Sequence, residues 1–137
     1  MKFDVVASLA GLPLFLAYFG AAVLLLVVFV VLYAMLTPYP EFKLIRGGNV
    51  AASVSLGGAV IGFVLPLCTA IQHAASFLDM LVWALVAMAV QILAYTLVRL
   101  TVPGIAREVS QGHVASGIWL GVVAAALGAL DAACMTP

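Results

Sequence analysis

The sequence predicts an all-α integral membrane protein with four transmembrane helices, and three observations carry this prediction. Of the 137 residues, 67% are hydrophobic and only 7% are charged, with a mean hydropathy of +1.34. The charged residues leave four uncharged stretches, each longer than the ~18 residues of a spanning helix: 5–40, 47–78, 80–98 and 109–130. No segment alternates in polarity as barrel strands do. With only short loops left, we expect one transmembrane domain over residues 1–137.

The first apolar stretch is expected to remain as a membrane helix. Its run over residues 5–36 far exceeds the ~7 to 15 residues of a signal-peptide core, and it lacks a convincing small-residue cleavage site. Pro38 and Pro40 oppose helical geometry in the residue before each of them. The first helix should therefore run from near Leu12 to about Leu36.

Turn and capping residues bound the second helix. Gly47 and Gly48 permit a turn, and Asn49 is a plausible N-cap. The helix is expected to reach about Ile71, with a kink at Pro66.

The last two helices have similar signals. Ser76 and Asp79 have the spacing of a capping box, which predicts the start of the third helix. That helix should end before Pro103, and the fourth should follow Gly112 and run to about Met135.

Four basic residues flank the two loops that join helices one to two and three to four. These are Lys43, Arg46, Arg99 and Arg107, whereas the opposite side carries only Lys2. Cytoplasmic loops carry the excess of Lys and Arg, so both termini are expected in the periplasm of a bacterial inner membrane. The four residues are also candidate contacts for a cytoplasmic partner or for lipid.

Two stretches resemble each other in register, "GGNVAASVSLGG" (47–58) and "QGHVASGIWLGV" (111–122). Gly112 aligns with Gly48 at an offset of 112 − 48 = 64 residues. Lys43 and Arg107 align at the same offset, so the basic loop recurs as well as the helix entry. Chance matching of common glycines and alanines is the alternative, but it does not predict matched loops.

The recurring unit is helix, basic loop, helix, with repeat one at about 10–72 and repeat two at about 74–136. An even number of helices per unit orients both copies alike. We therefore expect two parallel two-helix repeats related by a pseudo-two-fold axis along the membrane normal.

Small residues recur at helical spacing in the second and fourth helices. Such stripes let backbones approach closely in lipid, so they predict helix-packing faces; a homo-oligomeric contact or a pore lining is the alternative. The residues are Ser53, Gly57, Gly58 and Gly62, with Gly117, Gly121 and Ala125.

Few polar groups lie inside the predicted spans. Gln91 alone lies deep within one, where it is expected to form an interhelical hydrogen bond worth about 1 kcal/mol or to serve permeation. Asp131 should lie at the external interface as a solvated or capping carboxylate. Cys68 and Cys134 end equivalent helices. They are expected to be either two buried free thiols or a disulfide. No pair of candidate ligands has a recognised metal spacing.

The chain carries no motif of a hydrolase, zinc protease or nucleotide-binding loop, so we expect no enzyme, no cofactor and no nucleic-acid partner. Two classes of function remain. The bundle is either a membrane scaffold whose basic loops recruit a peripheral partner or contact anionic lipid, or a homo-oligomeric small channel or transporter component.

Three segments resemble a known family: "EFKLIRGGNVAASVSLGGAVIGFVLPL" (41–67), "VQIL" (90–93) and "DAACMT" (131–136). The chain is similar to the YjfL-type bacterial inner-membrane proteins, catalogued as domain of unknown function 350, whose two-helix domain usually occurs in tandem. The resemblance implies an inner-membrane protein without an established activity. Some relatives are encoded beside phage-shock-type peripheral membrane proteins and polyamine-ligase-like enzymes, which implies a role in envelope stress with a phage-shock-type partner.

Overall fold

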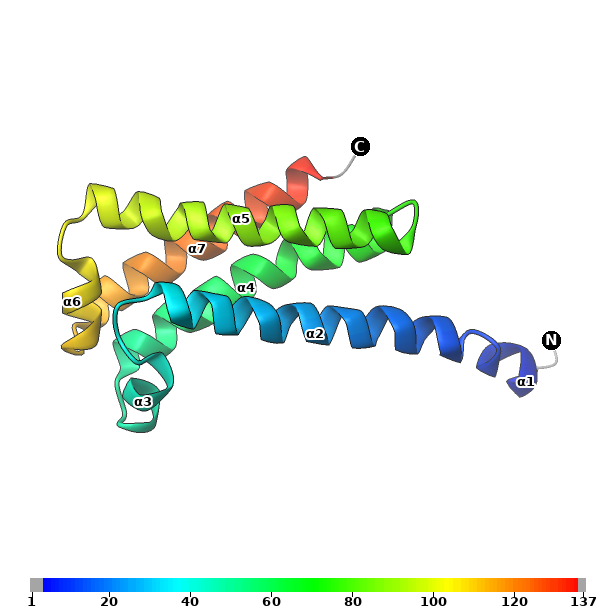
Figure 1. The fold of residues 1–137 in the computed structure, drawn as a ribbon, viewed down its shortest axis with the longest axis horizontal. Helices are drawn as coiled ribbons and strands as arrows, with labels where there is room; N and C mark the ends of the chain where they lie inside the picture. Colours follow the sequence, from blue (N-terminus) through cyan, green and yellow to red (C-terminus); the bar gives the residue numbers. More distant parts are fainter. Residues whose placement is uncertain (1–3, 136–137) are drawn as a thin grey trace.

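The structure is a computed structural model that describes residues 4–135, and all regular structure within them is helical (Figure 1). Four segments are long and apolar enough to span a membrane: Val5–Leu36, Val50–His73, Phe77–Thr101 and Val114–Cys134. The predicted fold class is therefore confirmed. The helices are α1 (Val5–Leu9), α2 (Leu12–Leu36), α3 (Glu41–Arg46), α4 (Val50–His73), α5 (Phe77–Thr101), α6 (Ile105–Ser110) and α7 (Val114–Cys134).

Side-chain caps fix where the long helices begin. The Asn49 side chain accepts a hydrogen bond from the Ala52 amide at 3.0 Å, as predicted for the start of α4. The Ser76 hydroxyl accepts from the Asp79 amide at 3.2 Å, and the Asp79 carboxylate accepts from the Ala75 amide at 2.9 Å. Both capping predictions are confirmed.

The two loops contain short helices that the sequence did not predict, α3 and α6. Each has six residues, too few for a periodic pattern to be recognised. Their first residues, Glu41 and Ile105, are buried against the bundle, so tertiary packing holds both helices in place.

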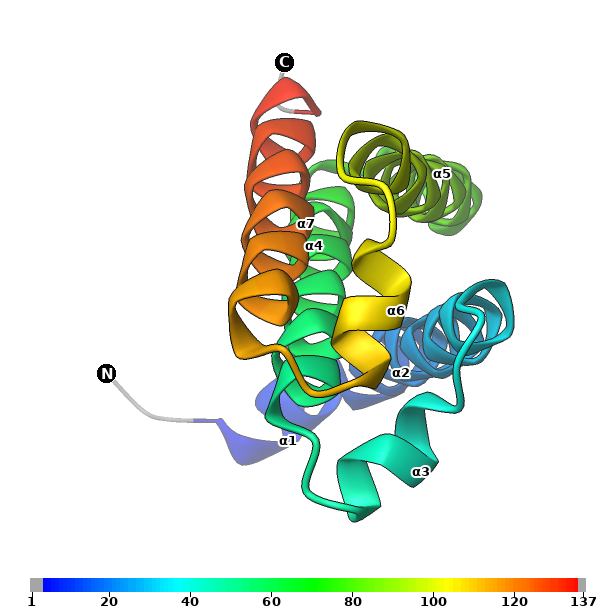
Figure 2. The ribbon, with the colours of Figure 1, turned by 90° about the vertical axis from the view of Figure 1, so that its left-hand side faces the viewer.

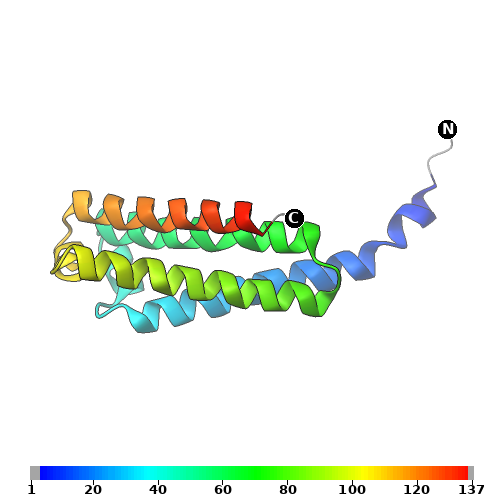
Figure 3. The same ribbon diagram turned by 90° about the horizontal axis from the view of Figure 1, so that it is seen from above.

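The long helices pack unequally. α4 and α7 lie side by side at the centre, and α5 packs against both of them. α2 reaches α4 and α5 mainly through the half that ends at Leu36, where Phe29 and Tyr33 are buried (Figure 3). Its first half leaves the bundle and is exposed along most of its length. Both described ends of the chain lie away from α3 and α6 (Figure 1).

The two loops share one backbone conformation at the offset of 64 residues. α3 and α6 begin and end at equivalent positions, and Gly48 and Gly112 have φ values of 85° and 83°. At positive φ a side chain would be strained, which explains glycine at both places. The amide of Asn49 donates to the Leu44 carbonyl, and the amide of His113 makes the equivalent bond to Glu108. The duplication and its symmetry axis stay predictions.

A candidate functional site at the loop end of the bundle

The two loops join into one unit, here named the loop cap (residues 37–49 and 102–113). The Asn49 side-chain amide donates to the carbonyls of Val109 at 3.0 Å and Ser110 at 3.3 Å, so a residue that caps α4 also holds the other loop. Figure 2 looks onto this end of the molecule, where α6 lies beside α4 and α7, which it contacts, and α3 lies to one side. The cap is therefore a defined surface.

All four predicted basic contact residues belong to the loop cap or border it. Lys43, Arg46, Arg99 and Arg107 are exposed, and none forms an ion pair with a carboxylate within residues 4–135. The guanidinium carbon of Arg99 lies 5.7 Å from the ring centre of Tyr95, within range of a cation–π contact. The four cations are thus free to meet an external anion.

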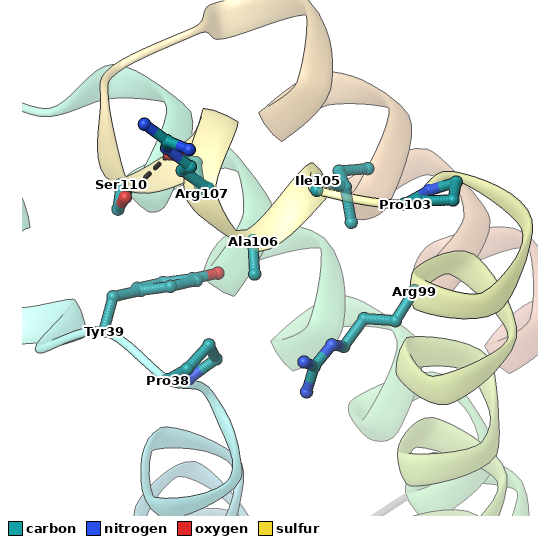
Figure 4. Close-up of a pocket in the computed structure, with 9 residues that line it drawn as sticks. Pro38, Tyr39, Arg99, Pro103, Ile105, Ala106, Arg107 and Ser110 are labelled. Atoms are coloured by element: carbon teal, nitrogen blue, oxygen red, sulfur yellow. Dashed lines mark hydrogen bonds between the residues drawn. The ribbon is translucent and has the colours of Figure 1, made fainter.

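A pocket of about 570 Å³ opens between the two loops (Figure 4). Arg99 extends into it from α5, and the ring of Tyr39 extends toward α6 from the other side. Pro38, Pro103 and Ile105 supply apolar walls. The pocket combines a cation with apolar surface at the end of the membrane-spanning helices.

Below the pocket lies a cluster of buried polar side chains, here named the Glu41 cluster: Tyr33, Tyr39, Glu41, Ser55 and Tyr95. They come from five parts of the fold, namely α2, the turn after it, α3, α4 and α5. The Glu41 side chain is only 2% exposed. Neither carboxylate oxygen of Glu41 meets the geometry of a hydrogen bond to any group within residues 4–135, and the same holds for the four hydroxyls. So many unpaired polar atoms are rare in a folded core.

Members of the Glu41 cluster lie close enough to influence one another. The rings of Tyr33 and Tyr95 are 5.6 Å apart in an edge-on arrangement. The Glu41 carboxylate acts electrostatically on the phenols of Tyr33, Tyr39 and Tyr95. Ser55 lies close to the phenols of Tyr33 and Tyr39. The five side chains therefore form one site.

Burial changes the acidity of the cluster outside the membrane-spanning helices. Desolvation raises the pKa of Glu41 from 4.5 to about 7, and the nearby hydroxyls of Thr37 and Tyr39 oppose that rise. Burial, followed by the charge of Glu41, raises the pKa of Tyr39 above its ordinary value. Glu41 therefore changes charge near neutral pH.

The sequence analysis missed Glu41, treating it only as one of the charges between apolar stretches. A signal was nevertheless available at the offset of 64 residues, where Glu41 aligns with Ile105. Ile105 is 1% exposed, so both positions are buried in the finished fold. An isoleucine at the equivalent place predicts burial for the glutamate.

The contact between α4 and α7 includes four of the seven predicted small residues. A Cβ atom on Gly58 would overlap the backbone of Gly121, and one on Gly117 would overlap the backbone of Ala51. One on Gly62 would overlap the backbone of Ala124. Side chains are excluded here because the backbones touch.

Two of the seven predicted residues lie outside the contact between α4 and α7, and one glycine in that contact was not predicted. Ser53 is exposed, and a Cβ on Gly57 would meet nothing within 4 Å, because both residues face away from α7. Gly128, which the prediction omitted, lies against the backbone of Gly62. Ala125 is half-buried beside this contact. The real face lies one residue further round α4, at Ala51, Ser55, Gly58 and Gly62.

Gln91 forms the interhelical hydrogen bond considered from the sequence. It is 1% exposed, and its side-chain nitrogen donates to the Ala124 carbonyl of α7 at 3.1 Å. Its side-chain oxygen is buried without a hydrogen-bond partner in the described chain. Gln91 thus links α5 to α7 beside the close backbone contact between α4 and α7.

The remaining candidate residues lie at the opposite end. Cys68 and Cys134 are free thiols, and both are exposed, so the expected burial is wrong because they end helices on outward faces. Asp131 is half-buried, and one of its carboxylate oxygens has no hydrogen-bond partner in the described chain. Within residues 4–135, no three His, Cys, Asp or Glu side chains group as a metal site.

A bundle of four apolar spans joined by short loops defines a small multi-pass membrane protein. The chain belongs to the family described as Domain of Unknown Function (DUF350), which matches residues 7–135. It is 36% identical to the UPF0719 inner membrane protein YjfL of Escherichia coli (strain K12) over 128 residues, 93% of this chain and 97% of that protein.

A second relative is the UPF0719 transmembrane protein YshE of Bacillus subtilis (strain 168), 28% identical over 87 residues, 64% of this chain and 65% of that protein. No solved structure matches. The expected family is confirmed, and the protein is a multi-pass inner-membrane protein.

Proposed function

We propose that the protein is a non-enzymatic inner-membrane scaffold whose loop cap recruits a peripheral partner on the cytoplasmic side. One observation carries the proposal: Asn49 ties the second loop to the first by hydrogen bonds to Val109 and Ser110. Basic residues that are far apart in the sequence thereby share one surface, which is what a docking site needs. Lys43 and Arg107 are its repeat-equivalent cations.

The composition of the cap supports this role. Phe42 on α3 is 51% exposed beside Lys43, so an apolar group and a cation are offered together. Such a mixture suits a protein surface or the headgroup region of an anionic membrane. The excess of Lys and Arg supports a cytoplasmic cap and periplasmic termini. The family resemblance suggests a phage-shock-type peripheral protein as partner and envelope stress as context.

The test is a pull-down with the full chain in lipid nanodiscs and a purified phage-shock-type peripheral protein. Lys43→Ala with Arg107→Ala removes two cations, each worth about 1 kcal/mol near a charged surface, so binding should weaken about 30-fold. The matched control, Lys43→Arg with Arg107→Lys, keeps the charge and should bind normally. Equal binding by all three chains would contradict the proposal. Vesicles with and without anionic lipid separate lipid contact from protein contact.

A homo-oligomeric channel or transporter component is the second candidate. The unpaired side-chain oxygen of Gln91 and the unpaired hydroxyl of Ser55 favour it, since both are polar atoms inside the bundle. The close backbone contact between α4 and α7 leaves no room for a path between those helices, so any pore would need several subunits. Native mass spectrometry in lipid distinguishes a monomer or dimer from a closed ring. An ion flux abolished by Gln91→Leu in such a ring would support the channel.

A further inference from the structure

Apart from Ser55, the Glu41 cluster takes no part in the proposed scaffold or in the close contact between α4 and α7. It holds a carboxyl group, three phenols and a serine hydroxyl, all buried and all without a hydrogen bond to another described group. An ionised carboxylate in such a place is strongly disfavoured unless a cation or hydrogen-bond donors compensate for its lost hydration. The question is what supplies that compensation.

No cation of the described chain supplies it. α3 carries Lys43 and Arg46, which are exposed. Arg99 on α5 is also exposed and lies over the ring of Tyr95.

Of the other packed elements, α6 carries Arg107, which is exposed and lines the pocket between the two loops. α2 and the turn after it contribute the phenols of Tyr33 and Tyr39 and the hydroxyl of Thr37, and α4 contributes the hydroxyl of Ser55. α6 places Ile105 and Ala106 in the same core. The pocket between the two loops is lined by Tyr39 of the cluster but not by Glu41.

We infer that the Glu41 cluster is a proton-binding site on the loop side of the membrane, and that release of its proton unseats α3 from the bundle. In the seated state the Glu41 carboxyl is protonated and neutral, which avoids the cost of burying a charge. On release the proton passes to water and leaves a carboxylate. That carboxylate regains its hydration only if Glu41, the first residue of α3, moves out of the core.

The repeat supplies an internal comparison. α6 has the same length and the same closing hydrogen bonds as α3, yet its first residue is Ile105. Isoleucine keeps that position buried at any pH. An apolar residue can therefore occupy this buried position, as Ile105 does in α6, yet α3 carries a glutamate there. Only α3 is therefore expected to respond to protons.

The consequence for recruitment rests on the proposed function. Lys43 and Arg46 belong to α3, so unseating α3 displaces half of the basic surface of the loop cap. Alkaline conditions on the loop side should therefore weaken partner binding, and acidic conditions should restore it. The proton site itself does not depend on that role.

The first experiment measures the proton directly. The sequence contains one other glutamate, Glu108, so Glu108→Gln leaves Glu41 as the single glutamate to label with ¹³C. Carbon NMR of the full chain in nanodiscs then follows its carboxyl from about pH 4 to about pH 9. The proposal expects a titration near neutral pH. A carboxyl that ionises near its usual pKa, or one kept ionised at acidic pH by added sodium or potassium, would overturn it.

The second experiment measures the movement of α3 through two equivalent residues, Ile45 and Val109. In a background with Cys68→Ser and Cys134→Ser, either residue is changed to cysteine and the rate of thiol labelling is followed with pH. Between the ordinary pKa of 4.5 and the raised pKa of about 7, the opening equilibrium of α3 should rise about tenfold for each pH unit, and above this window it should level off. Glu41→Gln in the Ile45→Cys chain corrects for the pH dependence of the thiol.

The two cysteine positions give distinct outcomes. Labelling at Ile45→Cys should exceed that in the Glu41→Gln chain at alkaline pH, whereas Val109→Cys should be unaffected by Glu41→Gln. Identical profiles with and without Glu41 would overturn the inference. If Glu41→Gln does not fold, Glu41→Ile provides the same comparison with the residue that α6 already carries. A proton site without any effect on partner binding would leave this inference standing and contradict the scaffold.

Discussion

The loop helices α3 and α6 are built alike and bury different chemistry. Both have six residues, both are followed two residues later by a glycine of positive φ, and both close with equivalent backbone hydrogen bonds. The first residue is Glu41 in one and Ile105 in the other, and both are buried. The comparison teaches that the shared backbone sets the position, while one side chain decides whether that position is inert or titratable.

The same contrast extends to the long helices. Tyr33 of α2 aligns with Leu97 of α5, and Tyr95 of α5 aligns with Val31 of α2. Both tyrosines are buried, whereas both aliphatic partners are exposed. The two helices that the predicted repeat pairs therefore use different faces. This is why the polar cluster forms once although the loops recur.

Placing a second acid in the other loop should give the largest change in stability. Ile105→Glu places a carboxylate in a buried position of α6, and an uncompensated buried charge costs about 3–5 kcal/mol. The free energy of unfolding at pH 8 should fall by that amount, measured by reversible denaturation followed by circular dichroism. Ile105→Gln, which is polar but uncharged, serves as the control. A loss below about 1 kcal/mol would show that α6 opens freely.

Removing the acid from α3 should have a slightly smaller effect of opposite sign. Burial raises the pKa of Glu41 above its ordinary 4.5 to about 7, so between these values the folded protein holds a proton that the unfolded chain releases. Stability therefore falls as pH rises through this window and levels off above it. The loss integrates to about 3 kcal/mol.

Glu41→Ile tests this dependence. The variant should lack this pH dependence, so that its stability relative to the parent rises by about 3 kcal/mol between about pH 4 and about pH 8. Parallel unfolding curves for parent and variant at both pH values would contradict a neutral carboxyl in the folded state.

The glycines offer a third comparison, between neighbours on α4. Gly58→Ala adds a methyl group that would overlap the backbone of Gly121, and backbones in contact cannot yield as side chains do. We expect a loss of about 2 kcal/mol in the free energy of unfolding. Gly57→Ala meets open space and should be neutral. Equal effects would mean that α4 is rotated relative to α7.

Apolar run lengths and end signals in the sequence were enough to predict the four spans. Asn49 and Ser76 were predicted as caps because capping is local in the chain. The packing face of α4 was wrong at Ser53 and Gly57 because several small residues lie on neighbouring faces, and only a partner helix selects one of them. Glu41 was missed because its burial depends on tyrosines of α2 and α5, whose positions no local pattern reveals.

The last comparison concerns the residues that begin α4 and α7. The Asn49 side chain caps α4 and also donates to two carbonyls of the other loop, whereas His113 at the equivalent place makes no side-chain capping bond. Asn49→Ala should therefore cost about 1–2 kcal/mol, and His113→Ala should cost little. Beyond stability, Asn49→Ala should raise amide hydrogen exchange in both loops, since their link is lost. If exchange rose only next to residue 49, the two loops would be independent of each other. The proposed scaffold would then lack the shared surface on which it depends.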